Sequence, residues 1–393
     1  MPNATITGWG KCLPPAVLSN HDLAQLVDTS DDWITSRTGI KERRISHVEV
    51  SDLAAVASHH ALAAAGKTAA DLDLIVLATC TGDSIIPSTA SILQAKLEAW
   101  NAAAFDLNAA CSGFVYALVV AGNMIKAGTH RTVLVVGAEK LHFHIDFTDR
   151  STCVLFGDGA GAVILESTDA DVGILSSELG MDGSAAAILC IPRDGTSGDR
   201  DYPEPKESRF QMDGPELFRR AVIRMGEASA RVIENAGLTL DQVDLLIPHQ
   251  ANVRIIDATA RRLGLDSAKV FVNIGSYGNT SAATIPVALT EALETRRIQP
   301  GNHVVFTAFG AGLSWGSAVM RWGDRVEPLS TSDAELSPNT RSTMEILAPN
   351  LKFFGHPTGV FVGSPGEGPR DQEQSESERI EPEQIELVRK ASS

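Results

Sequence analysis

The chain has 393 residues, 44% of them hydrophobic, which is enough apolar sequence to fill the cores of two or three domain-sized units. Its formal net charge of −16 excludes a broadly basic surface, so we expect neither non-specific nucleic-acid binding nor docking on an anionic membrane. The N-terminus lacks a signal-peptide pattern and no apolar run is long enough to span a bilayer, which favours a cytoplasmic protein. Five widely separated cysteines without a C-x-x-C spacing indicate neither a zinc site nor a disulfide scaffold.

An internal repeat divides the body of the chain. The segment AAGKTAADLDLIVLATC at 64–80 matches NAGLTLDQVDLLIPHQ at 235–250 with a constant offset (235 − 64 = 171). Each copy reads as a helix, a turn and a nearly continuous apolar strand, the kind that is buried in a parallel sheet covered by helices. The sequence therefore predicts two duplicated α/β halves, 1–170 and 171–325, with a functional site between them where equivalent strand ends converge.

The stretch FDLNAACSGF at 105–114 places Cys111 between a strand-like run and a helical one. A thiol at a helix N-terminus has its thiolate stabilised by the helix dipole, which would activate it as a nucleophile. Small neighbours would let a substrate carbonyl approach the sulfur closely. Taken alone, a free cysteine is more often a small core residue, and we keep that interpretation for Cys12, Cys80, Cys153 and Cys190.

Two histidines, His142 and His144, alternate in LHFHIDF. Their spacing suits a metal ion, but no third ligand is apparent and two ligands do not make a site. We therefore expect no metal at this position.

The second half supplies two polar residues after strand-like runs. His249 ends the apolar run of LLIPHQAN, and Asn279 follows VFVN at 270–273, a run that corresponds to the one before Cys111. Taken singly, His249 fits a buried structural histidine as well as a catalytic one. Asn279 alone fits a turn residue equally well. Because a duplicated fold brings equivalent strand ends together, we expect Cys111, His249 and Asn279 to meet in one site.

The composition changes after Trp322. Residues 326–393 hold seven of the 18 prolines and carry 12 acidic against six basic residues, a net charge of −6. Such a composition buries too little apolar surface to fold alone, so we predict a largely disordered acidic tail. Its one apolar patch, LKFFGHPTGVFVG at 351–363, is interrupted by Pro and Gly.

Four motifs together are far more specific than any single residue. DLNAACSGF, IPHQAN, YGNTSAA and AFGAGLSWG resemble those of β-ketoacyl-acyl-carrier-protein synthase III, and the resemblance covers residues 3–322. It implies an α/β, thiolase-like fold in which two duplicated halves form a layered α-β-α-β-α body. It also implies an acyltransferase that joins an acyl-CoA starter to malonyl-acyl-carrier protein by decarboxylative Claisen condensation, initiating fatty acid or polyketide synthesis.

The resemblance also implies roles for particular residues. Cys111 would accept the acyl group, with its own backbone N–H and that of Ala311 holding the oxyanion, while neutral His249 and Asn279 would donate hydrogen bonds to the enolate. Ile86 lies where some relatives carry a phenylalanine that closes the acyl pocket of the partner subunit, which implies a homodimer with room for longer or branched starters. No metal or other cofactor is implied, since acyl-CoA is a substrate. The remaining implied substrate contacts are Thr29, Trp33, Arg37 and Arg150 for the nucleotide end of coenzyme A, and Gly214, Asn252 and Phe309 for the pantetheine tunnel.

Three arginines in ANVRIIDATARRLG, namely Arg254, Arg261 and Arg262, have the spacing i, i+7, i+8 that puts them on one face of a helix. A solvated stripe is the ordinary interpretation of such a pattern. Because the helix would begin just after His249 and acyl carrier proteins are acidic, we predict that this face steers the carrier protein toward the site.

Three other functions share part of this pattern. The order Cys, His, Asn also occurs in papain-like cysteine hydrolases, and the separation of Cys111 from His249 (249 − 111 = 138) fits them, although the internal repeat argues against that class. Transfer of the acyl group to a hydroxyl or an amine would need a base where Asn279 has an amide. A non-enzymatic partner subunit would have no reason to keep all three residues.

Overall fold

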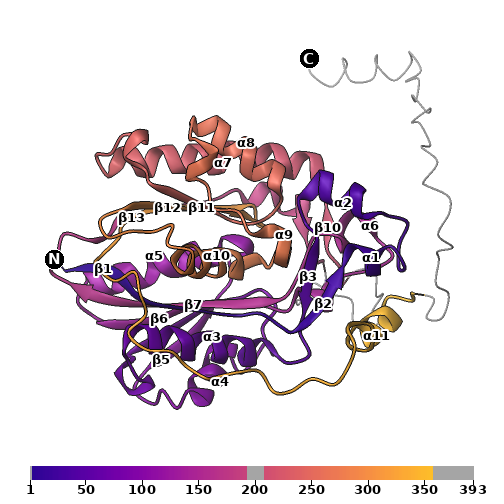
Figure 1. Ribbon diagram of the computed structural model, residues 1–393, viewed down its shortest axis with the longest axis horizontal. Coiled ribbons are helices and arrows are strands. Elements are labelled where there is room, and N and C mark those ends of the chain that lie inside the picture. The colour runs from indigo at the N-terminus through magenta and orange to yellow at the C-terminus, as the bar shows by residue number, and fades with distance from the viewer. Residues whose placement is uncertain (1, 193–207, 357–393) are drawn as a thin grey trace, which may run out of the picture. The chain divides into compact units, whose positions relative to one another are not determined.

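The computed structural model describes residues 2–192 and 208–356, and Figure 1 shows how their elements are arranged. Two stacked sheets form the centre. The first has five strands in the order β1-β7-β6-β4-β5, and the second has four in the order β11-β12-β13-β8. The first sheet consists of β1 (Asn3–Cys12), β4 (Leu74–Ala78), β5 (Ala103–Leu107), β6 (Thr132–Glu139) and β7 (Gly159–Thr168), and the second of β8 (Gly173–Met181), β11 (Leu245–Pro248), β12 (His303–Gly310) and β13 (Ser314–Arg321).

Helices form three layers around the two sheets (Figure 1). The middle layer contains α5 (Gly113–Lys126) and α10 (Thr284–Glu294), which contact both sheets. The outer face of the first sheet is covered by α3 (Val50–Ala65) and α4 (Thr89–Lys96). The outer face of the second sheet is covered by α7 (Gly214–Asn235), on which α8 (Val253–Leu263) packs. This alternation confirms the predicted thiolase-like fold with a layered α-β-α-β-α body.

The repeat in the sequence is visible in the strands. β4 and β11 begin at Leu74 and Leu245, and β6 and β12 begin at Thr132 and His303, so both pairs have the same offset (245 − 74 = 171 and 303 − 132 = 171). In each sheet the two strands are parallel neighbours. The two halves differ at the strand that follows β4 in the first half and β11 in the second. β5 pairs with β4 along its whole length, whereas the run at 270–273, which we expected to be a strand, makes only a single bridge to β11.

Apolar side chains fill the space between the sheets. The cluster there includes Phe114, Phe306 and Trp322, each at most 1% exposed. β4 and β6 are buried along their whole length because helices cover both faces of their sheet. Burying each large apolar side chain contributes roughly 1.5–3 kcal/mol, so this central layer is a main source of stability. No helix in the described part of the chain has the length and apolar character needed to cross a membrane.

Two glycines let segments of the chain approach one another closely. A Cβ on Gly137 of β6 would lie 2.3 Å from the carbonyl oxygen of Ala282, and one on Gly310 of β12 would lie 2.7 Å from the backbone nitrogen of Cys111. Real Cβ atoms do not come so close to other atoms, so only glycine permits these approaches. They hold the turn that contains Ala282 against β6, and the end of β12 against the backbone of Cys111.

A smaller set of elements covers one end of the two sheets, on the right in Figure 1. Their apolar side chains, among them Ile34, Leu141 and Phe210, pack in a second cluster together with Phe309 of β12. These elements are β2 (Ala16–Ser19), β3 (Glu42–Ile45), α1 (Asn20–Leu23), α2 (Asp31–Thr38), η3 (Leu141–His144), α6 (Arg150–Cys153), η4 (Gly183–Ile188), β9 (Leu189–Cys190) and β10 (Gln211–Met212). The remaining short helices are η1 (Ala69–Asp71), η2 (Ala110–Ser112), η6 (Leu240–Gln242), η7 (Ser267–Lys269), α9 (Ile274–Tyr277) and η8 (Ser281–Ala283).

The prediction of a largely disordered segment at 326–393 is wrong for its first part. Residues 326–356 have a defined course and include α11 (Thr343–Phe353), whose apolar side chains enter the second cluster. A capping box at Ser342 starts this helix and gives it a defined first turn despite the surrounding polar sequence. Residues 357–393, which include part of the predicted apolar patch, lie outside the described residues.

Candidate active site

A cavity of about 230 Å³ draws its lining from both sheets and from the elements that cover their end. Cys111 reaches it after β5, His249 after β11, and Asn279 just before η8. The cavity therefore brings together the three residues that the sequence predicted to meet. The other predicted residues in its wall are Trp33, Gly214, Asn252, Phe309 and Ala311.

Cys111 lies in η2, two residues before the start of α5. Its neighbour Ala110 has a φ of 47°, a left-handed conformation that is uncommon for a residue with a Cβ, and this turns the chain from β5 into the helix. The Cys111 side chain is 8% exposed, and burial raises the pKa of its thiol to about 12. We expected the helix dipole to favour the thiolate. The cost of burying the charge outweighs the dipole, so the resting group is a thiol.

His249 directly follows β11, and its backbone N–H donates to the carbonyl oxygen of Thr307 on β12 at 2.8 Å. The ring Nδ1 lies 2.7 Å from Oγ1 of Thr284. The side chain is 2% exposed, and burial lowers the pKa of His249 to about 3. The imidazole is therefore neutral near pH 7 and carries one ring proton.

Asn279 is held by backbone hydrogen bonds on both sides. Its N–H donates to the carbonyl oxygen of Leu155 at 2.9 Å, and its carbonyl oxygen accepts from the N–H of Gly157 at 3.0 Å. The side-chain Oδ1 accepts the backbone N–H of Ser281 at 2.8 Å. Because an N–H group can only donate, the atom facing Ser281 must be the amide oxygen, which leaves the amide nitrogen as a donor toward the cavity.

A buried carboxylate that the sequence analysis did not select lies behind the cavity. Glu139 ends β6, is fully buried, and accepts hydrogen bonds from the side chains of Cys80, Thr81 and Ser281. Burial raises the pKa of Glu139, and these donors oppose the rise. Cys80 and Ser281 line the cavity, and the Ser281 hydroxyl contacts the Cys111 thiol. Cys80, which we interpreted as a core residue, is therefore part of the cavity wall.

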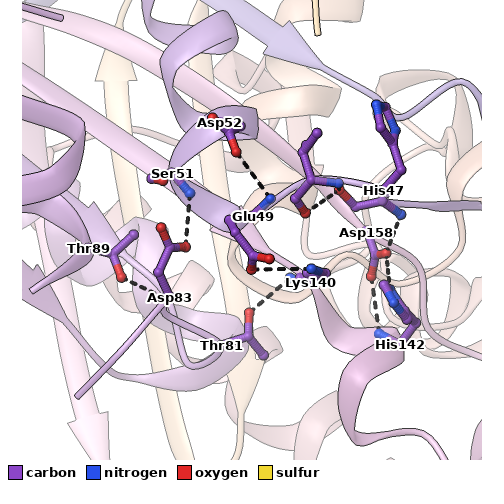
Figure 2. A network of polar contacts seen from close by, with 12 residues as sticks. His47, Glu49, Ser51, Asp52, Thr81, Asp83, Thr89, Lys140, His142 and Asp158 are labelled. Carbon is purple, nitrogen blue, oxygen red and sulfur yellow. Dashed lines mark hydrogen bonds and ion pairs between the residues drawn. The ribbon is translucent and has the colours of Figure 1, made fainter. Parts of the chain in front are cut away.

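From Thr81, one of these donors, polar contacts continue to the exposed Glu49 (Figure 2). The backbone N–H of Lys140 donates to Oγ1 of Thr81 at 2.9 Å, and the Lys140 ammonium pairs with Glu49 at 3.2 Å. The next residue, Leu141, lines the cavity. The network thus fixes the chain that forms this part of the cavity wall.

The two alternating histidines serve structural hydrogen bonds. Asp158 accepts the backbone N–H of His142 at 3.1 Å and lies 2.5 Å from its ring Nδ1, as Figure 2 shows. His144 donates from Nδ1 to the carbonyl oxygen of Ser208 at 3.2 Å. Within residues 2–192 and 208–356, no group of three His, Cys, Asp or Glu side chains could hold a metal ion.

Trp33, on α2, lines the cavity and carries two arginines against its ring. The guanidinium carbons of Arg37 and Arg150 lie 4.6 Å and 4.8 Å from the ring centroid. Arg150 also donates to the carbonyl oxygen of Asp28 at 2.9 Å, next to Thr29, whose buried hydroxyl has no partner among the described residues. The predicted nucleotide contacts therefore gather at this aromatic ring, although only Trp33 lines the cavity itself.

Ile86 does not line the cavity of its own chain. It lies in the connection from β4 to α4, is 87% exposed, and has the equally exposed Ile85 beside it. Two adjacent exposed isoleucines are unusual on a surface in contact with water and indicate a surface that is covered by something else.

The predicted arginine stripe lies on α8, whose N-cap residue lines the cavity. Arg254 and Arg261 are exposed, and the guanidinium of Arg254 lies 6.0 Å from the ring of Phe218 in the cavity wall. Arg262 instead pairs with Glu227 of α7 at 3.5 Å. Among the residues that the structure describes, Arg254 and Arg261 therefore form no ion pair, whereas the charge of Arg262 is partly neutralised.

Known proteins share the fold and much of the sequence of this chain. The crystal structure of 3-oxoacyl-[acyl-carrier-protein] synthase III from Aquifex aeolicus VF5 has a TM-score of 0.77 and 47% sequence identity, over 81% of this chain and 100% of that chain. The family described as 3-Oxoacyl-[acyl-carrier-protein (ACP)] synthase III matches residues 105–183, and its C-terminal counterpart matches residues 233–322. The fold and the cavity together define a ketosynthase of the thiolase fold.

Two curated relatives narrow this class. Beta-ketoacyl-[acyl-carrier-protein] synthase III 2 of Vibrio vulnificus (strain YJ016) is 53% identical over 344 residues, which cover 88% of this chain and 95% of the relative. Beta-ketoacyl-[acyl-carrier-protein] synthase III of Symbiobacterium thermophilum is 50% identical over 326 residues, which cover 81% of this chain and 98% of the relative. The chain belongs to the β-ketoacyl-acyl-carrier-protein synthase III family and is an acyltransferase. This membership does not favour a cysteine hydrolase, a non-enzymatic subunit, or acyl transfer to a hydroxyl or an amine.

Proposed function

We propose that this chain takes an acyl group from coenzyme A onto Cys111 and condenses it with malonyl-acyl-carrier protein, releasing carbon dioxide and initiating a fatty acid chain. The observation that carries this proposal is the meeting of one thiol nucleophile, Cys111, with two uncharged polar groups, His249 and Asn279, in a single buried cavity. A condensing enzyme needs such neutral groups, because its second substrate develops a negative charge.

In the first step the Cys111 sulfur attacks the thioester carbonyl carbon. The backbone N–H groups of Cys111 and Ala311 hold the oxyanion that forms. The thiol loses its proton to solvent as the sulfur–carbon bond forms. Breakdown of the intermediate breaks the bond to coenzyme A, which leaves as a thiolate and takes up a proton from solvent. The high pKa of Cys111 keeps the sulfur protonated until a substrate arrives.

In the second step malonyl carrier protein loses carbon dioxide, and the electron pair left behind forms an enolate whose charge lies on the thioester oxygen. His249 and Asn279 donate hydrogen bonds to this oxygen and add no charge of their own. The enolate carbon attacks the carbonyl carbon of acyl-Cys111 and forms the new carbon–carbon bond. The Cys111 thiolate then leaves and takes up a proton from solvent.

The cavity entrance fits a nucleotide with a long flexible arm. Trp33 and Arg150 hold the adenine by stacking, and Arg37 supplies positive charge for the phosphates. The Thr29 hydroxyl at this entrance has no hydrogen-bond partner among residues 2–192 and 208–356. The pantetheine arm passes along the wall residues Gly214, Asn252 and Phe309 to reach Cys111.

A homodimer completes the acyl pocket. β5 is an edge strand, and Ile85 and Ile86 lie exposed on the connection after its neighbour β4. An unpaired edge beside exposed apolar side chains favours association with a second copy. In the dimer, Ile86 of one subunit closes the acyl pocket of the other. Isoleucine is smaller than phenylalanine, so the pocket accepts longer or branched starters.

The carrier protein approaches along α8. Arg254 near the cavity and Arg261 farther along the same helix form no ion pair with another described residue, so on a chain whose net charge is −16 they attract an acidic partner to this face. Arg262 contributes less because it is paired with Glu227.

Intact-protein mass spectrometry after exposure to a panel of acyl-CoAs tests the proposal. We expect one acyl adduct per wild-type chain, no adduct on Cys111→Ala, and a normal adduct on the matched control Cys190→Ala, whose thiol does not line the cavity. Addition of malonyl-acyl-carrier protein should then discharge the adduct and yield β-ketoacyl-acyl-carrier protein. Acylation of Cys111→Ala, or an adduct that malonyl carrier protein does not discharge, would refute the proposal.

A further inference from the structure

One hydrogen bond of His249 involves a side chain that does not line the cavity. The ring Nδ1 lies 2.7 Å from Oγ1 of Thr284, and both side chains are buried. The same hydroxyl lies 3.0 Å from the carbonyl oxygen of Ser281. A threonine hydroxyl has a single proton, so it donates to one of these two acceptors at a time.

The two choices give His249 opposite chemistry. If the hydroxyl donates to the Ser281 carbonyl, its oxygen accepts a protonated Nδ1, and Nε2 faces the substrate as an acceptor. If the hydroxyl donates to Nδ1, the ring proton is on Nε2, which then faces the substrate as a donor. The doubly protonated ring is absent near pH 7 because burial lowers the pKa of His249 to about 3. The direction of the Thr284 hydroxyl therefore determines whether Nε2 of His249 donates a hydrogen bond to the substrate or accepts one.

Two observations favour donation to Nδ1. The carbonyl oxygen of Ser281 already accepts the backbone N–H of Thr284, so it keeps a partner when the hydroxyl turns away. The contact with His249 is also the shorter of the two, 2.7 Å against 3.0 Å. Donation to Nδ1 thus satisfies both acceptors, one through the hydroxyl of Thr284 and the other through its backbone.

We propose that Thr284 donates its hydroxyl proton to Nδ1 of His249 and thereby keeps the ring proton on Nε2, facing the substrate. Thr284 is then a positioning residue, which acts on the reaction only through His249. The inference rests on the proposed function, because the enolate oxygen needs a donor and not an acceptor. Since Ser281 orients the amide of Asn279 in the same turn, residues 279–284 orient both donors of the condensation step.

Three substitutions separate this role from a structural one. Thr284→Val removes the hydroxyl and keeps the shape, and Thr284→Ser keeps the hydroxyl. Thr290→Val is the matched control, because it removes a buried hydroxyl from the same helix, one that donates to the carbonyl oxygen of Pro286 at 2.9 Å.

We expect Thr284→Val to slow the decarboxylation of malonyl carrier protein by the acylated enzyme about 10- to 100-fold, by analogy with the loss seen when a group that orients a metal-bound histidine is removed. Acylation of Cys111 should change little. Thr284→Ser should recover most of the decarboxylation rate, and Thr290→Val should match the wild type. Wild-type decarboxylation by Thr284→Val would overturn the proposal.

Nitrogen NMR of the ¹⁵N-histidine-labelled wild type reads the tautomer directly, and it decides the question even if Thr284→Val does not fold. The His249 signals are those missing from the His249→Gln variant. We expect a protonated Nε2 and an unprotonated Nδ1, and the reverse pattern would overturn the proposal. That result would leave the proposed function standing, because the function fails only if Cys111 is not acylated or if condensation does not follow.

Discussion

The backbone N–H of Ser281 donates to Oδ1 of Asn279 at 2.8 Å, which leaves only the amide nitrogen of Asn279 to face the cavity. Asn279→Asp keeps the size of the side chain and this hydrogen bond but presents a carboxylate oxygen where negative charge develops. Loss of one such donor typically slows a reaction about 10²- to 10³-fold, and we expect the rate of malonyl decarboxylation to fall by at least this factor. Cys111 should still be acylated. Separate single-turnover assays of the two half-reactions measure this. Equal loss of both would show that Asn279 serves Cys111 instead.

The reactivity of Cys111 should depend steeply on pH. Burial raises the pKa of its thiol to about 12, and only the thiolate reacts with an alkylating reagent. We expect the rate of Cys111 modification by iodoacetamide in the free enzyme to rise about tenfold per pH unit between pH 7 and pH 10, with no plateau. Peptide mass spectrometry at timed intervals gives the rate. A plateau at or below pH 8 would mean that the thiolate is already stable at rest.

The buried imidazole of His249 should make the fold less stable in acid. Its pKa is about 3 in the folded chain against an ordinary value of 6.5, so between these values the unfolded chain binds a proton that the folded chain does not. Lowering the pH therefore favours unfolding by about 1.4 kcal/mol per unit below pH 6.5. We expect the free energy of unfolding of wild type, relative to His249→Gln, to fall by about 2 kcal/mol from pH 7 to pH 5 in urea titrations. A constant difference across this range would contradict the lowered pKa.

Ile86→Phe should change the choice of starter. A larger side chain at the tip of the exposed connection would fill part of the acyl pocket of the other subunit, so we expect kcat/KM to shift toward short acyl-CoAs. Ile85→Phe is the matched control, because Ile85 is equally exposed, at 89% against 87%, but no acyl-pocket role is proposed for it. Sedimentation of both variants checks that the dimer persists. A monomeric wild type, or the same shift in both variants, would remove the basis for this prediction.

Charge reversal on α8 should weaken the use of the carrier protein and spare the small substrate. We expect Arg254→Glu combined with Arg261→Glu to raise the KM for malonyl carrier protein several-fold and to reduce its dependence on salt, with little change in the acylation of Cys111 by acyl-CoA. Arg131→Glu is the charge control, since Arg131 is exposed at the opposite end of β6 from the cavity. If the control raises the KM as much as the double variant, net charge rather than this face is responsible.

The fold, and the meeting of Cys111, His249 and Asn279 in one cavity, could be predicted because the signals are local. The apolar strands and the two copies of the 171-residue repeat can each be recognised from short runs of consecutive residues. Cys111, His249 and Asn279 each follow a run that the repeat places at the same end of a sheet. Which apolar runs pair as strands was harder to predict than the fold. The run before Asn279 has strand composition, yet it makes a single bridge because pairing also depends on the neighbours that the tertiary structure provides.

The groups that support the site could not be predicted in the same way. Thr284 and His249 are 35 residues apart, and Glu139 gathers donors from segments on both sides of it, so only the fold shows that they meet. The protonation state of Cys111 also escaped prediction, because a helix N-terminus is visible in the sequence while the degree of burial is not. Helix α11 had a local signal in its capping box at Ser342, but the prolines and acidic residues around it concealed that signal.

The division of the cavity between the two halves has a consequence for the protein as it is made. Cys111 leaves the ribosome 138 residues before His249 and 168 before Asn279 (249 − 111 and 279 − 111). Until the later residues have emerged, Gly310 of β12 cannot pack against the backbone of Cys111, so a nascent chain carries this thiol without the groups that we propose act with it. On the proposed roles, a chain that ends before these residues lacks both enolate donors, so we expect it neither to release carbon dioxide from malonyl carrier protein nor to form the new carbon–carbon bond.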